Sequence, residues 1–253
     1  MKVHGVAAVV TGGASGLGGA VAARLAEQGA KVTIIDLNRE LGEAHAKAIG
    51  GLFIQGDVTQ EEVVEHALET AEGVHGKARI LVNCAGIGPP AKAINRDGKA
   101  LALADFARII NINLNGTFNV LSKFAARLHA SALEGEERGV IINTASVAAF
   151  DGQIGQPAYA ASKAGIVGMT LPLAREFARY GIRVMTIAPG IFLTPLLATL
   201  PEEAQRSLGQ QVPFPSRLGQ PDEFAQLVQS IVENSMLNGE VIRLDGAIRM
   251  AAR

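Results

Sequence analysis

The stretch that decides the fold is residues 6–18, VAAVVTGGASGLG. Its first six residues are mostly apolar and β-branched, which predicts a short buried strand over residues 6–11. Gly12, Gly16 and Gly18 follow in the spacing Gly-x3-Gly-x-Gly, and a helical pattern begins at Gly16. Glycines at such a turn let backbone N–H groups approach an anion at the helix N-terminus, where the helix dipole favours negative charge. A tight βα turn would explain the spacing alone, but its place in the first strand–helix unit favours binding of a dinucleotide pyrophosphate.

Strand and helix patterns alternate along the rest of the chain. We expect further strands over residues 31–36, 52–55, 80–83, 139–144, 183–188 and 241–244. We expect helices over residues 16–28, 40–49, 60–74, 105–133, 159–180 and 222–232, with a kink at Pro172. Apolar strands that alternate with helices are typical of a parallel sheet covered on both faces. The sequence therefore predicts a single α/β domain over residues 1–253, with a Rossmann-type doubly wound parallel sheet of about seven strands.

Length, charge and cysteine content exclude several classes of protein. The 253 residues are 48% hydrophobic, which is enough apolar material for one large core. The formal net charge is −1 and neither end carries a basic tail, which argues against binding of nucleic acid. Cys84 is the only cysteine, so no intramolecular disulfide forms and a reducing compartment fits best. The five histidines are scattered without ligand spacing, so we expect no metal site.

No stretch of the sequence predicts a membrane span. The longest uncharged stretch, residues 184–201, contains three prolines and reads as a strand followed by a loop. The N-terminus lacks a charged region followed by an apolar signal core, and little sequence precedes the first strand. We therefore expect a cytoplasmic protein, or a mitochondrial matrix protein if the source is eukaryotic.

An acidic residue at the end of the second strand bears on the cofactor. Asp36 lies 18 residues after Gly18 (36 − 18). A carboxylate there can accept hydrogen bonds from an adenosine ribose and would repel a 2′-phosphate. The glycine loop also lacks Arg and Lys, so NAD is favoured over NADP. Asp57 and Val58, after the third strand, could flank an adenine, although Asp57 is equally well placed to cap the next helix.

A tyrosine and a lysine suggest acid–base chemistry. Tyr159 and Lys163 are four residues apart and share one helix face. A phenol is a poor base at neutral pH, but a neighbouring ammonium favours the phenolate and lowers its pKa. Ser146 lies 13 residues upstream of Tyr159 (159 − 146), where its hydroxyl could hold a substrate oxygen. A Tyr-x3-Lys pair alone is usually a surface pair, and only together with Ser146 and the glycine loop does it indicate a catalytic site.

These motifs together resemble the short-chain dehydrogenase/reductase family, over essentially the whole chain. The glycine loop looks like the cofactor loop of that family, and residues 83–86, NCAG, look like its strand-four motif. The resemblance implies four catalytic residues, namely Ser146, Tyr159, Lys163 and Asn113. It also implies contacts to the cofactor from Gly12, Ser15, Gly16, Leu17, Gly18, Asp36, Asp57, Val58, Asn83, Ala85, Gly86, Tyr159, Lys163, Pro189, Gly190 and Thr194.

Three further segments narrow the resemblance. Residues 139–150, 211–219 and 238–250 resemble one subfamily, whose members oxidise 3-hydroxyacyl-CoA esters with NAD, accept 2-methyl-branched esters and can act on steroid alcohols. The resemblance implies that the Tyr159 phenolate takes the proton of the substrate hydroxyl as hydride leaves for the nicotinamide. Lys163 would lower the Tyr159 pKa and hold the nicotinamide ribose. Asn113 would help to keep a water in a proton relay from Lys163 to solvent.

Several other functions compete with this interpretation. A 3-oxoacyl thioester reductase of the same family would run the reverse reaction, usually with NADPH, and Asp36 argues against it. A hydroxysteroid dehydrogenase would keep the same catalytic residues. A methyltransferase would explain the glycine loop but not Tyr159 together with Lys163. A catalytically silent dinucleotide-binding or scaffold protein would not need the complete set of catalytic side chains.

Substrate contacts and assembly are less sharply marked in the sequence. Gln153 and Gln156 lie between Ser146 and Tyr159, and one of them is expected to touch the substrate. The apolar segment 191–200 resembles a substrate lid. Helices over residues 106–127 and 159–169 correspond to those that the family uses for dimer contacts, and a homotetramer is expected, although thick packing within one chain would also explain their apolar and small residues.

A basic loop is a further candidate for substrate binding. Lys92, Arg96 and Lys99 lie within residues 89–103, a longer connection than a plain loop needs. These cations could meet the phosphates of CoA, and a solvated surface loop explains them equally well.

Overall fold

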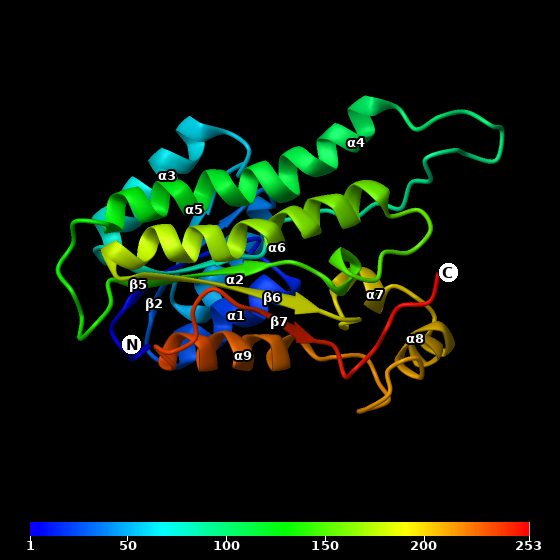
Figure 1. Ribbon diagram of the computed structural model, residues 1–253. Coiled ribbons are helices and arrows are strands. Elements are labelled where there is room, and N and C mark those ends of the chain that lie inside the picture. The colour runs from blue at the N-terminus through cyan, green and yellow to red at the C-terminus, as the bar shows by residue number, and fades with distance from the viewer. Residues whose placement is uncertain (253) are drawn as a thin grey trace.

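A computed structural model describes residues 1–252, without the side chain of Leu196, and contains a seven-stranded parallel sheet (Figure 1). The strand order is β3-β2-β1-β4-β5-β6-β7. The order reverses between β1 and β4, and ligands of such sheets bind beyond the carboxyl ends of the strands at that point. This arrangement confirms the predicted fold class. The strands are β1 (Ala7–Thr11), β2 (Lys31–Asp36), β3 (Leu52–Gln55), β4 (Ala78–Asn83), β5 (Gly139–Thr144), β6 (Ile182–Pro189) and β7 (Val241–Leu244).

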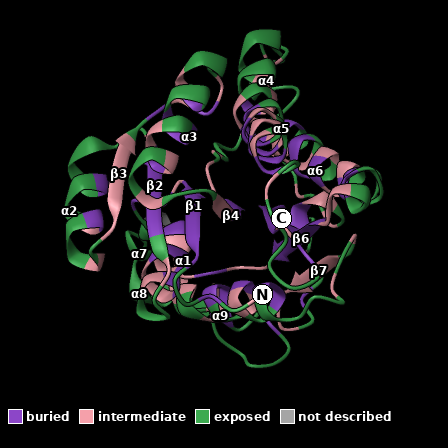
Figure 2. Cartoon of the chain, turned by 90° about the vertical axis from the view of Figure 1, so that its left-hand side faces the viewer, coloured by how far each residue is buried: buried purple, intermediate pink, exposed green. Residues whose placement is uncertain are grey.

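Helices cover both faces of the sheet, as Figures 1 and 2 show. The helices α3, α5 and α6 contribute apolar side chains to one buried cluster, and α1 and α9 contribute to another. Among the described residues, none of the helices combines the length and apolar character needed to span a bilayer. The bounds of the helices are α1 (Gly16–Glu27), α2 (Arg39–Ile49), α3 (Glu61–His75), α4 (Leu103–Ile110), α5 (Gly116–Leu128), α6 (Pro157–Phe177), α7 (Pro195–Ala198), α8 (Glu202–Gly209) and α9 (Pro221–Glu233).

Neighbouring strand residues feed opposite layers of the core. Val9 and Ile141 pack into the cluster on the α5 and α6 side, while Val10 and Ile142 pack into the cluster on the α1 and α9 side. All four side chains are fully buried. A strand that is buried on both faces reads as a continuous apolar run, which is why its pattern could be found in the sequence.

The long helix expected over residues 105–133 is shorter and irregular in the structure. It comprises α4, a π-helical turn over Asn111–Asn115, and α5, which ends at Leu128. The Ser131 N–H donates to the Leu128 carbonyl at 3.0 Å, so a turn replaces the last predicted helical residues. In contrast, α6 continues through Pro172 as far as Phe177.

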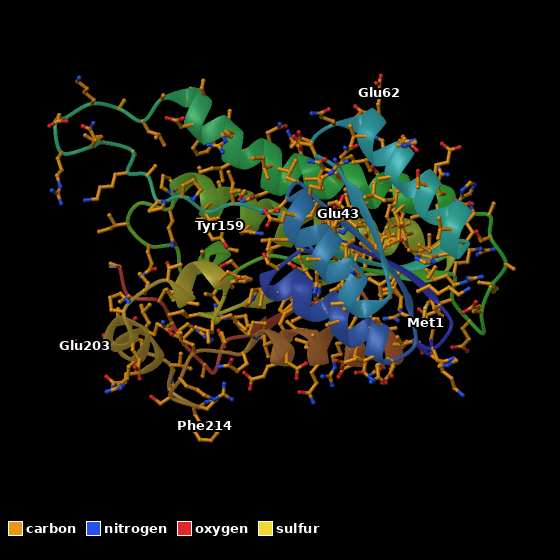
Figure 3. The ribbon with its side chains drawn as sticks, turned by 180° about the vertical axis from the view of Figure 1, so that it is seen from behind. Met1, Glu43, Glu62, Tyr159, Glu203 and Phe214 are labelled. Carbon is orange, nitrogen blue, oxygen red and sulfur yellow. The ribbon has the colours of Figure 1, made fainter. Side chains whose placement is uncertain are left out.

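The segment interpreted as an apolar loop contains helical structure. Residues 191–200 include the short helix α7, and α8 follows after Pro201. Only one of the eight residues of α8 is buried and four are exposed, so the helix shows little of the apolar periodicity that identifies a helix from sequence. Figure 3 shows Tyr159 toward the same end of the molecule as Glu203 of α8, with Met1 toward the opposite end.

Candidate active site

The glycine loop between β1 and α1 leaves no room for a side chain at Gly12 or Gly18. A Cβ on Gly12 would lie 2.7 Å from the Ala85 nitrogen, and one on Gly18 would lie 2.3 Å from the Gly12 carbonyl oxygen. Gly12 and Gly16 also have positive φ angles of +65° and +58°, which favour glycine. The first-turn N–H groups of α1 have no acceptor within the helix. The loop therefore forms a compact backbone cradle that fits a pyrophosphate.

Asp36 is attached directly to this loop. One carboxylate oxygen accepts a hydrogen bond from the Ala14 N–H at 3.1 Å, and the other accepts from the Asn38 N–H at 2.9 Å. A carboxylate has about four acceptor sites, so capacity remains for a ribose hydroxyl. The position of Asp36 beside the loop fits an adenosine ribose and disfavours a 2′-phosphate.

Asp57 and Val58 make local contacts. Asp57 accepts hydrogen bonds from the N–H and hydroxyl of Thr59 at 2.9 and 2.8 Å, which organises the turn before α3. Val58 is buried, and a Cβ on Gly116 would come within 2.7 Å of its side chain. Asp57 therefore makes the local contacts of a turn-forming residue. It does not cap the helix itself, because the N-cap of α3 is Gln60.

Asn83 ties together three strand ends. Its amide donates to the Asn143 side-chain oxygen of β5 at 3.0 Å, and its own oxygen accepts from the Thr11 hydroxyl of β1 at 3.3 Å. Asn83 itself is 3% exposed. It therefore supports the position of the residues that follow, Ala85 and Gly86, rather than presenting a free polar group at the surface.

Gly86 lies close to two of the predicted catalytic residues. A Cβ on Gly86 would lie 3.1 Å from Asn113 Oδ1 and 3.6 Å from Lys163 Nζ.

The fold brings Ser146, Tyr159 and Lys163 together. Ser146 follows β5, while Tyr159 and Lys163 lie on α6, where the sequence pattern placed them. The Ser146 hydroxyl hydrogen-bonds the Tyr159 phenol, and Lys163 Nζ lies 5.8 Å from the centroid of the Tyr159 ring. Lys163 Nζ donates to the Thr144 carbonyl at 2.7 Å. A phenol, a serine hydroxyl and a lysine ammonium therefore share one site.

The charge properties of this site correct one expectation. Burial raises the pKa of the Tyr159 phenol above its usual value, and the hydrogen bond from Ser146 only opposes that rise. Burial also lowers the pKa of Lys163 to about 8. The predicted lowering of the Tyr159 pKa by Lys163 is therefore wrong for the protein alone, because Lys163 is directed at Thr144 and the phenol is buried.

Asn113 lies in the π-helical turn, and its side chain is fully used by the protein. Its amide donates to the Ile87 carbonyl at 2.8 Å and to the Ser162 hydroxyl at 3.0 Å, and its oxygen accepts from the Ile87 N–H at 2.8 Å. The Thr117 hydroxyl donates to the Asn113 carbonyl at 2.7 Å. Asn113 therefore links the segment after β4 to α6.

Ser162 is the residue of this site whose role the sequence did not reveal. Its hydroxyl accepts from Asn113 and donates to the Tyr159 carbonyl at 2.7 Å, and the residue is completely buried. The only signal in the sequence was a small polar residue between Tyr159 and Lys163.

The segment after β6 lies over the glycine loop. The Gly190 N–H donates to the Leu244 carbonyl at 2.9 Å, and a Cβ on Gly190 would lie 2.9 Å from the Asp245 Cα. A Cβ on Gly16 would lie 3.5 Å from the ring of Pro195, which directly follows Thr194. The residues expected to meet the nicotinamide carboxamide, Pro189, Gly190 and Thr194, are thus on the same side as the loop expected to hold the pyrophosphate.

The two predicted substrate residues bind the chain itself. The Gln153 amide donates to the Ala251 carbonyl at 3.0 Å, and the Gln156 side-chain oxygen accepts from the Gln153 N–H at 3.1 Å. The ring of Tyr159 is covered by the segment after β4, because a Cβ on Gly88 would come within 3.1 Å of it. This segment therefore covers Tyr159, and residues 150–156 lead directly into α6, which carries it.

The basic loop forms a small exposed hairpin. The Asn95 N–H donates to the Lys99 carbonyl and the Leu101 N–H to the Ala93 carbonyl, both at 2.9 Å. Lys92, Arg96 and Lys99 are exposed. Their ammonium and guanidinium groups are available at the surface.

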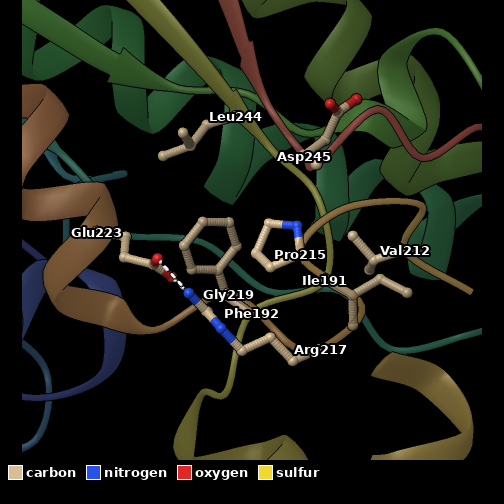
Figure 4. A pocket seen from close by; sticks show the side chains of 10 residues that line it. Ile191, Phe192, Val212, Pro215, Arg217, Gly219, Glu223, Leu244 and Asp245 are labelled. Carbon is tan, nitrogen blue, oxygen red and sulfur yellow. Dashed lines mark hydrogen bonds and ion pairs between the residues drawn. The ribbon is translucent and has the colours of Figure 1, made fainter. Parts of the chain in front are cut away.

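A separate pocket of roughly 100 Å³ lies between the end of β7 and the start of α9 (Figure 4). Its walls include Phe192 and Leu244, and Arg217 at its edge forms an ion pair with Glu223 at 2.7 Å. None of Ser146, Tyr159 and Lys163 lines it. The pocket is therefore distinct from the site around Tyr159.

Comparison with known proteins agrees with this geometry. Residues 6–205 match the family model described as short chain dehydrogenase. The chain belongs to the short-chain dehydrogenase family.

Individual relatives narrow the similarity. The chain is 57% identical to the 3-hydroxyacyl-CoA dehydrogenase type-2 of Homo sapiens, with 98% of this chain and 97% of that protein covered. It is 53% identical to the protein of the same name from Drosophila melanogaster, covering 98% and 99%. A crystal structure of 3-hydroxyacyl-CoA dehydrogenase type-2 from Mycobacterium avium superposes with a TM-score of 0.94, at 43% identity and 98% coverage of both chains.

Proposed function

We propose that this protein oxidises the 3-hydroxyl group of 3-hydroxyacyl-CoA to the 3-oxo group, with NAD as the hydride acceptor. The observation that carries the proposal is the convergence of Ser146, Tyr159 and Lys163 beside the glycine loop, in a chain 57% identical to a 3-hydroxyacyl-CoA dehydrogenase type-2. Esters with a 2-methyl branch are included in the proposed substrate class.

The roles of the side chains follow from their positions. Tyr159 accepts the proton of the substrate hydroxyl as general base. Ser146, which hydrogen-bonds the phenol, orients the substrate oxygen and stabilises the charge that develops on it. Lys163, held by the Thr144 carbonyl, supplies positive charge close to the phenol and donates to the nicotinamide ribose. Asn113 fixes the segment after β4 against α6, which keeps these groups in place. We assign to it also the task of helping to keep a water in a proton relay from Lys163.

The cofactor contacts are assigned to the backbone cradle and Asp36. The residues are Gly12, Ser15, Gly16, Leu17 and Gly18 for the pyrophosphate, Asp36 for the adenosine ribose, and Pro189, Gly190 and Thr194 for the nicotinamide. When bound, NAD⁺ supplies the hydride acceptor and a positively charged ring that favours the phenolate form of Tyr159.

One competing function, reduction of a 3-oxoacyl thioester, is supported by a specific observation. The chain is 34% identical to the 3-oxoacyl-[acyl-carrier-protein] reductase FabG of Thermotoga maritima, over 98% of its length. A reductase of this kind would use the same catalytic side chains in reverse. Asp36, whose carboxylate lies against the glycine loop, favours NAD and hence the oxidative assignment.

The test is a comparison of the wild-type protein with Tyr159→Phe. We expect the wild type to reduce NAD in the presence of 3-hydroxyacyl-CoA, with a kcat/KM for NAD at least tenfold above that for NADP. We expect Tyr159→Phe to lose at least about a thousandfold in kcat while binding NADH with unchanged affinity, because the ring stays and only the proton acceptor is removed. Retention of turnover by a folded Tyr159→Phe protein would refute the assignment of Tyr159.

The basic hairpin is proposed to bind the phosphates of CoA. Lys92, Arg96 and Lys99 are exposed, and the hairpin directly follows the segment that covers Tyr159. In a Lys92→Ala/Arg96→Ala/Lys99→Ala variant we expect KM for the CoA ester to rise about tenfold and KM for the matching acyl-pantetheine to stay within twofold, because only the ester carries the phosphates. Equal effects on the two substrates would show that the hairpin is a plain surface loop.

Assembly and location complete the proposal. We propose that residues 1–253 act as one cofactor-binding domain within a homotetramer, a state that light scattering on the purified protein would measure. A cytoplasmic location, or the mitochondrial matrix in a eukaryote, is supported by the single unpaired cysteine, Cys84.

A further inference from the structure

A segment near the C-terminus holds the loop that joins Ser146 to Tyr159. We name residues 150–156 the active-site loop and residues 245–252 the C-terminal strap. Arg243 of β7 binds both of them: Nη2 donates to Asp151 Oδ2 at 2.6 Å and to the Ile248 carbonyl at 3.0 Å. Its guanidinium also lies 5.2 Å from the centroid of the Phe150 ring. Arg243 therefore joins the two segments.

The path of the strap is set by an unusual turn. Gly246 and Ala247 both have positive φ angles, +59° and +68°, and Ala247 is the only non-glycine residue among residues 1–252 with a positive φ. This conformation is unfavourable for alanine and persists only where its surroundings hold it. Asp245 holds the turn, since its Oδ1 accepts from the Ala247 N–H at 3.0 Å. Ile248, just after the turn, is 2% exposed and anchors the strap in the core.

Beyond Ile248 the strap runs along the outer side of the active-site loop. The Gln153 amide donates to the Ala251 carbonyl, and the Ile154 N–H donates to the Ala252 carbonyl, both at 3.0 Å. The Met250 backbone also donates to the Asp151 carboxylate. Several bonds thus connect the strap to a loop of only seven residues.

The inner side of the active-site loop is fixed as well. The Ala91 N–H donates to the Gly155 carbonyl at 2.7 Å, and residues just before Ala91 cover the Tyr159 ring. The loop is therefore held between the segment after β4 and the strap. The strap side differs from the other in that it includes the ion pair between Arg243 and Asp151.

The hydrogen bond from Arg243 lowers the pKa of Asp151, so this carboxylate is ionised at neutral pH. The other charged groups near it are Arg249, which acts on the same carboxylate, and Asp245, which shares Arg243 at 2.7 Å. The pair is thus intact under ordinary assay conditions.

We propose that the C-terminal strap is a specificity element: through Asp151 and Ile154 it fixes the active-site loop as a rigid wall of the acyl pocket. This inference rests on the proposed oxidation of 3-hydroxyacyl-CoA. A pocket can distinguish substrates that differ by one methyl group by a factor of about 10 to 200 in kcat/KM. This requires that the walls of the pocket do not move to accommodate the extra group. The strap would therefore govern how well the enzyme distinguishes straight-chain from 2-methyl-branched substrates.

Two variants loosen the strap in different ways. Asp151→Asn removes the charge that Arg243 binds, and a chain that ends at Arg249 lacks the residues that bond to Gln153 and Ile154. The matched control is Asp222→Asn, which removes a carboxylate from the ion pair of Arg24 at 2.9 Å, between α1 and α9. The measurements are kcat and KM for NAD and for both substrate classes, and hydrogen exchange of residues 150–156.

We expect KM for 3-hydroxyacyl-CoA to rise at least fivefold in both strap variants and the ratio of kcat/KM between the two substrate classes to change at least fivefold. KM for NAD should stay within twofold, and the control should behave as wild type. The amides of residues 150–156 should exchange at least tenfold faster, with β5 unchanged. If Asp151→Asn does not fold, the same measurements on the chain that ends at Arg249 test the proposal.

Faster exchange with unchanged KM and selectivity would overturn the proposal, as would unchanged exchange in both variants. Failure of the proposed function itself gives a different result, because the wild type would then not turn over either acyl-CoA. In that case hydrogen exchange still tests whether the strap holds the loop. The amides of residues 150–156 should exchange slowly in the wild type and the control, and fast in the two strap variants.

Discussion

Ser162 lies between Tyr159 and Lys163 in sequence, and its buried hydroxyl connects α6 to Asn113. It receives a hydrogen bond from Asn113 and gives one to the Tyr159 carbonyl. Ser146, Tyr159 and Lys163 could be selected from the sequence because short spacings along the chain identify them. The partner of Lys163, the Thr144 carbonyl, and the partners of Asn113 could not, because they come from other elements.

Replacement of Ser162 by alanine is expected to lower kcat about tenfold with little change in NAD affinity. The variant leaves one buried N–H of Asn113 without an acceptor, which costs about 1 to 3 kcal/mol, and loosens α6 at Tyr159. Steady-state kinetics and NADH binding check this. Thr170→Val is the control, since Thr170 is also a buried hydroxyl of α6 but bonds to Ile166 and Thr186. Ser162→Thr should restore most of kcat; no recovery would contradict the role of the hydroxyl.

At the scale of the element, regular segments were predictable and irregular ones were not. The bounds of β2, β3, β5 and β7 match the predicted strands residue for residue. The end of α5 and the helix α8 were missed, because a turn at Leu128 and a largely exposed helix leave no apolar period to detect. The π-helical turn at Asn111–Asn115 has no sequence signal of its own either.

The start of α9 offers a test of one element by pH. Glu223 accepts hydrogen bonds from the Gln220 N–H and from Arg217 in both carboxylate oxygens. The Arg217 hydrogen bonds, and then the Gln220 N–H, lower the pKa of Glu223 from 4.5 to about 2. A lowered carboxyl pKa stabilises the folded state above pH 4.5, and this contribution is lost as pH falls toward 2.

Glu223→Gln is therefore expected to destabilise the protein at pH 7 by about 1 kcal/mol or less, since both side chains are partly exposed and solvent screens the pair. The difference in unfolding free energy from wild type should shrink at pH 3. Urea unfolding at the two pH values measures it. Glu202→Gln, in the exposed pair with Arg206, should change stability less at both. A difference that is equally large at pH 3 would show that the charge of Glu223 does not matter.

At the scale of the molecule, the carboxyl ends of the strands carry the proposed site and the amino ends carry stabilising contacts. The proposed catalytic groups follow the carboxyl ends of β4 and β5 and the proposed nicotinamide contacts follow that of β6, while a buried ion pair lies at the amino ends. Arg183, near the start of β6, donates to Glu137 at 2.6 Å and to the Ile231, Val232 and Leu237 carbonyls at or beyond the end of α9. Both charged residues are 5% exposed. The pair fastens the sheet to α9.

Arg183→Met should accordingly cost about 1 to 3 kcal/mol of stability, because Glu137 loses its guanidinium partner and keeps only the N-terminal ammonium of Met1 at 2.6 Å. At 25 °C the folded fraction should keep the wild-type kcat, since Arg183 lies at the far end of β6 from Tyr159. Denaturant unfolding and kinetics at one temperature test both statements. Arg39→Met, in an exposed pair with Glu43, should change stability by about 0.5 kcal/mol at most. A large loss of kcat in folded Arg183→Met would contradict this division of tasks.

The sequence by itself determined the fold class, the glycine loop and the proposed catalytic trio. These depend on apolar runs, on glycines that a tight turn requires and on residues four positions apart on one helix, all of which are local patterns. Only the tertiary structure decided that burial raises the pKa of Tyr159, that Asn113 and Ser162 link α6 to the segment after β4, and that Arg243 joins the C-terminal strap to the active-site loop. Those properties depend on which distant segments the packing of the sheet brings into contact, and no short window of sequence contains both partners.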